Sequence, residues 1–242
     1  MSGYLLTAID PQMPAGLYGK VPEKGDFICR RLSRLFVDPW DAWLQRGIER
    51  SKEILGEDWL PAYLQAPLWR FGLVPGICGE HGVTGVLMAS VDRVGRYFPL
   101  TLFACADDNA AIPPPEFGSQ DDWFDAAEAF LMSTLDHDAN FEAMTADLGA
   151  LPPPFQELAK APPEGAGYDR NGPHALPAPG ESFSKLFSSI RVRDYAKIYA
   201  GSTFWWTIGG EGVTPVALSG KGMPDPFLFA AMLTGEFAAD PA

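Results

Sequence analysis

The chain has 242 residues, 47% of them hydrophobic, so it is long and apolar enough to bury a substantial core. Its formal net charge of −13 argues against a nucleic-acid groove or an anionic membrane surface, which both need clustered lysine and arginine, and suits a partner with basic patches better. Three cysteines without CxxC spacing predict reduced thiols, and neither a secretion signal nor a membrane-length apolar run occurs. We therefore expect a cytoplasmic protein that does not insert into membranes.

The first part of the chain predicts a short strand followed by two helices. The strand is expected at residues 17–18, before a loop rich in glycine and proline. A helix is expected over 39–55, with Asp38-Pro39 as its start and Gly56 as its end. Its apolar residues recur at helical spacing (Trp40, Trp43, Leu44 and Ile48). A shorter helix is expected over 58–65.

The middle of the chain predicts three neighbouring strands. The runs 68–76, 82–93 and 96–106 are rich in β-branched and aromatic residues, which favour strands. Glycine, proline and charged residues separate them, and the connections are short. The simplest arrangement is an antiparallel meander.

The remaining elements are also read from apolar periodicity and turn residues. Helices are expected over 121–135, 141–148, 182–199 and 225–235, strands over 202–210 and 213–220, and an irregular proline- and glycine-rich segment over 151–181. Together these elements predict one α/β (α+β) domain over residues 1–242. Its sheet is expected to be mixed, mostly antiparallel, with about five or more strands, and covered by helices.

The segment DRVGR, residues 92–96, places Asp92, Arg93 and Arg96 inside an otherwise apolar stretch. One interpretation is catalytic, but the sequence has no GxSxG, HExxH, Walker or GxGxxG motif, and its three histidines lack metal-ligand spacing. A second is a hairpin turn, in which Gly95 supplies a positive φ. In that case an ion pair between Asp26 and Arg96 is our candidate for fixing the loop.

The third interpretation is a recognition surface for a protein partner. Arginine and aromatic residues are enriched in protein interfaces, and Arg93, Arg96 and Tyr97 lie close together in sequence. Further candidates of the same types are Arg30, Trp205 and Trp206. Adjacent tryptophans in a strand point to opposite faces, so one of them either lies under a helix or is exposed for a partner.

Three long segments resemble the hallmark segments of the TagF family, also called ImpM, which is associated with bacterial type VI secretion systems. They are GLYGKVPEKGDFICRRL, the run from FVDPWDAWL to LVPGICG, and GVLMASVDRVGRYFPLTLFA, and together they span residues 16–104 almost without interruption. STFWWTIGGEG near the C-terminus resembles the last block of the family. Residues 107–181 match only loosely.

This resemblance implies a cytoplasmic, non-enzymatic protein that represses assembly or firing of the secretion apparatus after translation. The implied partner is the forkhead-associated scaffold protein of that system, and no cofactor, metal or catalytic residue is implied. Some relatives are fused to a PP2C-type phosphatase domain, whereas this chain is expected to be the stand-alone form.

Two other functions stay open from the residues alone. A metal-dependent hydrolase or phosphatase-like enzyme would require Asp26, Asp92 and a third acid to converge on one cavity. A structural subunit of the secretion apparatus would form stable oligomers and expose large apolar patches.

Overall fold

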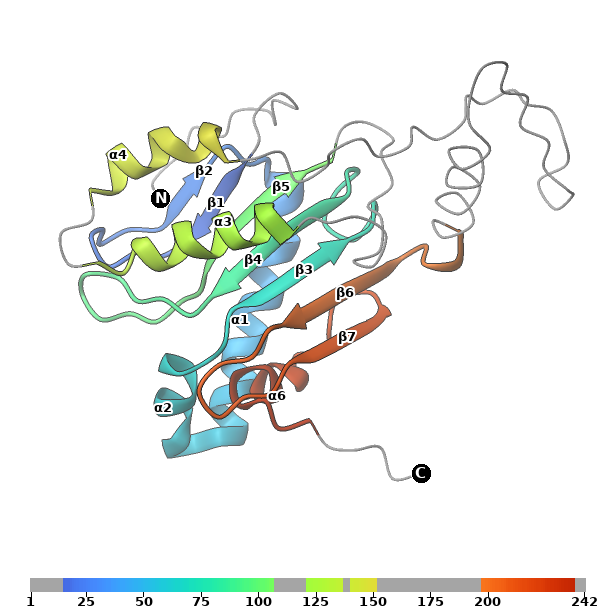
Figure 1. Ribbon diagram of the computed structural model, residues 1–242. Helices are drawn as coiled ribbons and strands as arrows, with labels where there is room; N and C mark the ends of the chain where they lie inside the picture. The colour runs from blue at the N-terminus through green and yellow to red at the C-terminus, as the bar shows by residue number, and fades with distance from the viewer. Residues whose placement is uncertain (1–14, 107–120, 137–139, 152–196, 238–242) are drawn as a thin grey trace, which may run out of the picture.

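One seven-stranded sheet with helices on both faces forms the centre of the computed structural model, which describes residues 15–106, 121–136, 140–151 and 197–237 (Figure 1). The strand order is β2-β1-β5-β4-β3-β6-β7, and each neighbouring pair is antiparallel. The prediction of an α+β fold with a mostly antiparallel sheet of at least five strands is confirmed.

Apart from β2, which the sequence does not predict, the strands and helices follow the predicted order. The strands are β1 Gly16–Gly19, β2 Ile28–Arg30, β3 Trp69–Leu73, β4 Val83–Met88, β5 Leu100–Cys105, β6 Ser202–Thr207 and β7 Val216–Lys221. The helices are α1 Arg34–Leu55, α2 Trp59–Leu64, α3 Asp121–Ser133, α4 Phe141–Ala146 and α6 Leu228–Thr234, with 3-10 turns η1 Gly56–Asp58 and η3 Asp147–Ala150. The predicted meander is β3-β4-β5, and the predicted segment 151–181 and helix 182–199 lie almost wholly outside the described residues.

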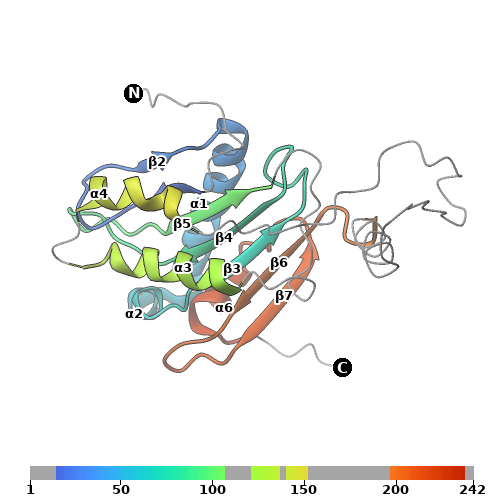
Figure 2. The ribbon, with the colours of Figure 1, turned by 45° about the horizontal axis from the view of Figure 1, so that its top comes forward.

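An aromatic core lies between the sheet and the layer formed by α1, α2 and α6 (Figure 1, Figure 2). The Trp40 ring of α1 stacks on Trp205 of β6 with centroids 5.9 Å apart, and Phe71 of β3 lies 4.7 Å from Trp40. The Trp43 indole N–H donates a hydrogen bond to the Pro224 carbonyl, which fixes the approach to α6. Burial of these large rings is the main stabilising contribution on this face.

A second core lies on the opposite face of the sheet, under α3 and α4 (Figure 2). Arg70 of β3 points to this face, and its guanidinium is almost fully buried. It donates to Glu128 at 2.6 Å and to Asp125 at 2.8 Å, and it lies over the Phe124 ring at 5.2 Å. These contacts hold α3 on the sheet through charge-assisted hydrogen bonds.

Helix α1 begins earlier than predicted. It starts at Arg34 after Ser33, so Asp38 is not the N-cap and Pro39 lies inside the helix. An internal proline removes one backbone donor and normally disfavours a helix. Here the first turn is held by tertiary packing, because Phe36 is buried against Phe103 of β5 at 4.5 Å. The predicted end at Gly56 is confirmed, since Gly56 is the C-cap with a φ of 53°.

Candidate functional site

Residues 92–96 form the turn that leads from β4 to β5. The Asp92 N–H donates to the Arg96 carbonyl at 3.0 Å, and the Gly95 N–H donates to the Asp92 carbonyl at 3.0 Å. Gly95 has a φ of 84°, a conformation that costs little only for glycine. The sequence therefore folds locally into a tight turn, as the second interpretation of this segment predicted.

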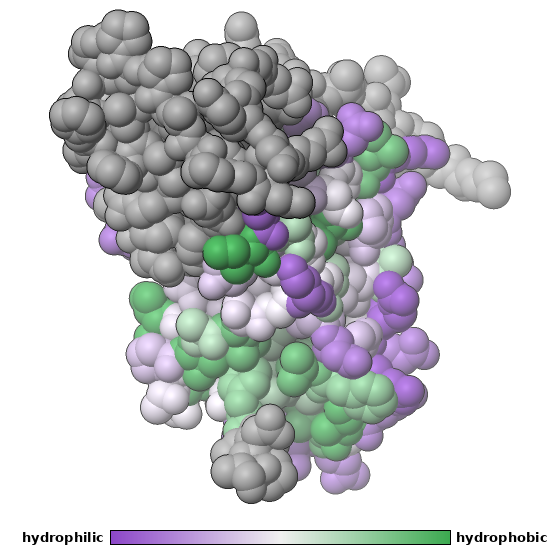
Figure 3. Space-filling view, turned by 90° about the vertical axis from the view of Figure 1, so that its right-hand side faces the viewer, coloured by the Kyte–Doolittle hydropathy of each residue, from purple (hydrophilic) through white to green (hydrophobic). Residues whose placement is uncertain are grey.

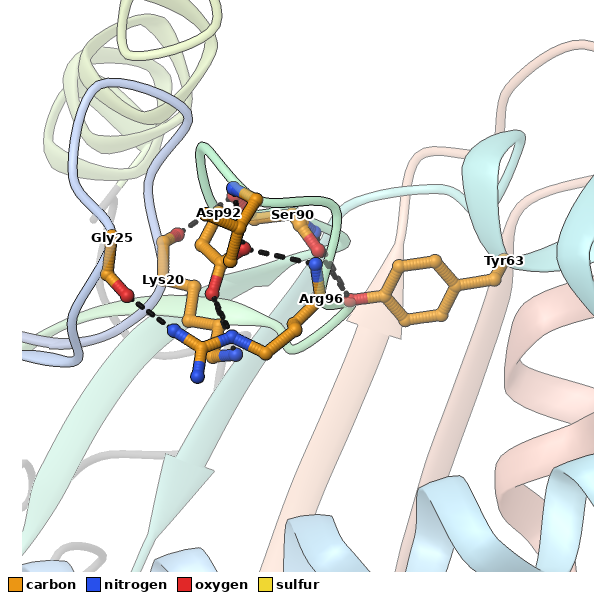
Figure 4. A network of polar contacts seen from close by, with 7 residues as sticks. Lys20, Gly25, Tyr63, Ser90, Asp92 and Arg96 are labelled. Carbon is orange, nitrogen blue, oxygen red and sulfur yellow. Dashed lines mark hydrogen bonds and ion pairs between the residues drawn. The ribbon is translucent and has the colours of Figure 1, made fainter.

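The Asp92 carboxylate is fully buried inside the turn and receives four hydrogen bonds (Figure 4). Its Oδ1 accepts from the Val94 N–H at 3.0 Å and from the Arg96 N–H at 2.9 Å. Its Oδ2 accepts from Lys20 Nζ at 2.9 Å and from Arg96 Nε at 2.6 Å. Burial alone would raise the pKa of Asp92, but these donors and two cations together hold it well below its usual range.

Lys20 and Tyr63 tie this turn to distant parts of the chain (Figure 4). Lys20 follows β1, and its carbonyl accepts from Ser90 Oγ at 2.7 Å. The Tyr63 hydroxyl, from α2, donates to the Ser90 carbonyl at 2.9 Å and accepts from the Ser90 N–H at 3.1 Å. Burial raises the pKa of Tyr63, so this hydroxyl stays protonated and can donate. The turn is thus fixed from β1 and from α2.

Arg96 fixes the preceding loop, but not through the predicted ion pair. Its guanidinium donates to the Gly25 carbonyl and to Asp92, and within the described residues no ion pair joins it to Asp26. The prediction that Asp26 is the ion-pair partner of Arg96 is therefore wrong. The loop that contains Asp26 does contact the turn, because Arg96 binds the Gly25 carbonyl. The physical reason is burial: Asp92 lies inside the turn, where a guanidinium offsets the cost of an unpaired charge, whereas Asp26 is exposed and hydrated.

Arg93 and Val94 form the exposed tip of the turn. The Arg93 N–H donates to the Lys24 carbonyl at 3.1 Å, which fixes the backbone at the tip. The Val94 side chain is 65% exposed, and no ion pair engages the Arg93 guanidinium anywhere in the described ranges. The tip therefore presents a cation and an apolar group to solvent on a rigid backbone.

The predicted candidate Arg30 lies on the edge strand β2, beside α4. Its guanidinium reaches Glu142 at 3.5 Å, and Lys24 reaches the same carboxylate at 3.4 Å. All three side chains are partly exposed, so solvent screens these ion pairs and their effect on stability is small.

The aromatic candidates are structural supports in this fold. Tyr97 is half-buried, with its ring 5.9 Å from Trp59 and 5.7 Å from Tyr63. Trp205 is buried against α1, and Trp206, on the other face of β6, lies 5.0 Å from Phe124 of α3. The two tryptophans thus point to opposite faces, and each contacts a helix.

The acidic residues named for a metal-dependent enzyme do not converge. Asp92 is saturated by Lys20 and Arg96, and the described residues contain no group of three or more His, Cys, Asp or Glu placed to hold a metal ion. A pocket of about 230 Å³ near the start of α1 is lined in part by Cys78 and Cys105. Burial raises the pKa of Cys78 to about 12 and that of Cys105 to about 11, so both thiols are poor nucleophiles at neutral pH.

Sequence reasoning missed Lys20, Tyr63 and Ser90. They lie 72, 29 and 2 positions from Asp92, and no spacing rule links a lysine at the end of a short strand to an acid in a distant turn. All three residues do occur within the segments that resemble the TagF family. None of the helices within the described ranges is long and apolar enough to cross a membrane.

Comparisons with known proteins show the family of this chain. The TagF N-terminal domain family, described as type VI secretion system-associated, matches residues 16–151. No curated protein sequence matches the chain significantly. The crystal structure of PA0076 from Pseudomonas aeruginosa PAO1, at 2.05 Å resolution, is similar with a TM-score of 0.75 and 35% sequence identity, covering 94% of this chain and 97% of that chain. The chain belongs to the TagF family of proteins associated with type VI secretion systems.

Proposed function

We propose that this protein is a non-enzymatic, post-translational negative regulator of a type VI secretion system, acting in the cytoplasm by binding another protein. The forkhead-associated scaffold of the same system is the proposed partner. The proposal rests on the family match over residues 16–151, which contains the whole of the Asp92 turn. Within that turn the Asp92 carboxylate is bound by Lys20 and Arg96, whereas Arg93 and Val94 are exposed. This arrangement favours a contact surface over a catalytic centre.

Two measurements test this proposal. Purified chain and purified scaffold should form a complex in solution by calorimetry. Deleting the gene should increase secretion of a type VI substrate at unchanged transcript levels, because the repression acts after translation. No detectable complex, together with unchanged secretion in the deletion strain, would contradict the proposal.

A structural subunit of the secretion apparatus is the second candidate, favoured by one observation. On the face seen in Figure 3, apolar side chains gather in the lower part of the view, while hydrophilic side chains follow one side. Phe227 and Leu228, at the start of α6, are 56% and 40% exposed. Ile54, at the end of α1, is 50% exposed. Exposed apolar patches often mark interfaces between proteins.

Co-purification with the assembled apparatus separates the two candidates. A regulator that binds its partner reversibly is expected to be purified apart from the assembled apparatus. A subunit is expected to co-purify with the apparatus at fixed stoichiometry, and Phe227→Ser should then release it.

A further inference from the structure

The turn at residues 92–96 contains one arginine, Arg93, that lacks a carboxylate partner within the described residues. Lys20 and Arg96 share the single carboxylate of Asp92, at 2.9 and 2.6 Å, and Arg93 has no ion pair within the described parts of the chain. The exposed acids of the adjoining loop, Glu23 and Asp26, form no ion pair with these three cations in the described parts of the chain. The Arg93 guanidinium is therefore the cation of this turn that no carboxylate contacts.

Local charge, not net charge, governs the contact once two proteins touch. At physiological ionic strength the screening length is about 8 Å, so the remote acidic residues act weakly at the tip. The Arg93 guanidinium lies beside Gly25, at 3.8 Å from where a Cβ on that residue would stand, so it extends over the loop without a carboxylate partner. An incoming carboxylate would meet this guanidinium first.

The backbone of the tip is already ordered for binding. Asp92 accepts the N–H groups of Val94 and Arg96, and the Arg93 N–H is held by Lys24. A preorganised loop loses little conformational entropy on binding, which increases the affinity that a small contact can provide. Arginine is one of the residue types enriched at interface hot spots.

We propose that Arg93 and Val94 dock onto an acidic, partly apolar face of the scaffold partner, while Asp92, Lys20 and Arg96 only position this tip. This inference rests on the proposed function and adds the chemistry of the partner's surface. Arg93 and Val94 are then the contact residues, and Asp92, Lys20 and Arg96 are positioning residues.

Charge reversal at the tip tests the proposal against a matched control. Arg93→Glu and Arg46→Glu change the net charge equally, and both residues are exposed, but Arg46 lies on the solvent face of α1. With purified scaffold as the probe, we expect Arg93→Glu to weaken binding at least about tenfold and Arg46→Glu to leave it within about twofold. Arg93→Lys should retain part of the affinity, because it keeps the charge but loses the bidentate fork.

Each outcome decides between the claims. Equal losses for Arg93→Glu and Arg46→Glu would show a general charge effect and overturn the inference, as would unchanged binding by Arg93→Glu. Both results would leave the proposed function standing, because the scaffold is still bound by the wild-type chain. If the wild-type chain does not bind the scaffold at all, the proposed function is contradicted and the inference falls with it. Melting temperatures of the variants within about 2 °C of wild type exclude misfolding as the cause.

Discussion

Asp92 decides the conformation of the whole turn, because one buried carboxylate organises two backbone N–H groups and two cations. Asp92→Asn would remove the charge and leave the Lys20 ammonium, 5% exposed, without a counter-ion. We expect a clearly lower melting temperature for this variant in thermal unfolding. Asp26→Asn is the control, since that acid is exposed, and its melting temperature should match wild type. Equal melting temperatures for the two variants would show that the network does not stabilise the fold.

The same residue predicts a dependence of stability on pH. The pKa of Asp92 is lower in the folded protein than in the unfolded chain, where aspartate has a pKa of about 3.9. Its contribution is therefore fully present above the unfolded pKa and is lost as pH falls through the folded pKa. Urea unfolding below about pH 4 should show a steeper loss of unfolding free energy for wild type than for Asp92→Asn. Parallel pH profiles would contradict this assignment.

Sequence reasoning at the residue scale identified the turn but not its support. The charged interruption at residues 92–96 and Gly95 predicted a hairpin, which is confirmed. The predicted ion pair between Asp26 and Arg96 does not form, and the Arg96 guanidinium contacts Asp92 and the Gly25 carbonyl instead. Side-chain burial determines which of the two acids pairs with Arg96. The burial of a single turn residue depends on tertiary contacts, which cannot be predicted from sequence spacing.

At the scale of elements, α3 depends on one strand residue. Replacing Arg70 by alanine removes its hydrogen bonds to Asp125 and Glu128 and its packing over Phe124. Because both acids can be rehydrated in part, we expect a loss of about 2–3 kcal/mol in unfolding free energy by urea denaturation. Asp121→Asn, whose carboxylate is 79% exposed and 4.0 Å from Arg70, should change it by less than about 0.5 kcal/mol. Equal effects of both changes would exclude this role for Arg70.

Two strand glycines give a second prediction at this scale. A Cβ on Gly85 of β4 would lie 2.4 Å from Phe71 Cζ and 2.6 Å from the Leu102 carbonyl, so the core must shift to admit it. We expect Gly85→Ala to lower the unfolding free energy by about 1–3 kcal/mol. Gly220→Ala on the edge strand β7 meets nothing within 4 Å and should be within about 0.5 kcal/mol of wild type. A neutral Gly85→Ala in the same assay would show that the backbone there moves freely.

The elements that were predicted well share strong periodicity or strong strand composition. The meander β3-β4-β5 and helix α1 have many large apolar residues in a short span, and the structure confirms these elements. Strand β2 has only three residues, too few to show alternation, so the sequence does not predict it. The start of α1 was misplaced because Asp38-Pro39 is a normal start signal, and only the packing of Phe36 against β5 shows that the helix begins earlier.

At the scale of the molecule, the C-terminal strands complete the sheet of the family's N-terminal domain. Strand β6 pairs with β3, and Trp205 fills the core between Trp40, Trp43 and Phe71. We therefore propose that the chain folds as a single domain. A chain truncated after residue 151 should lose cooperative thermal unfolding and near-ultraviolet circular dichroism. A cooperative transition of the truncated chain would show instead that residues 16–151 fold independently.

A crystal structure of the chain bound to the forkhead-associated scaffold would test the role of this turn most directly. We expect the Arg93 guanidinium within about 4 Å of a partner carboxylate, with Val94 buried and the contacts of Asp92 to Lys20 and Arg96 unchanged. A complex in which the scaffold contacts other elements and leaves the turn in solvent would contradict the proposed role of Arg93 and Val94.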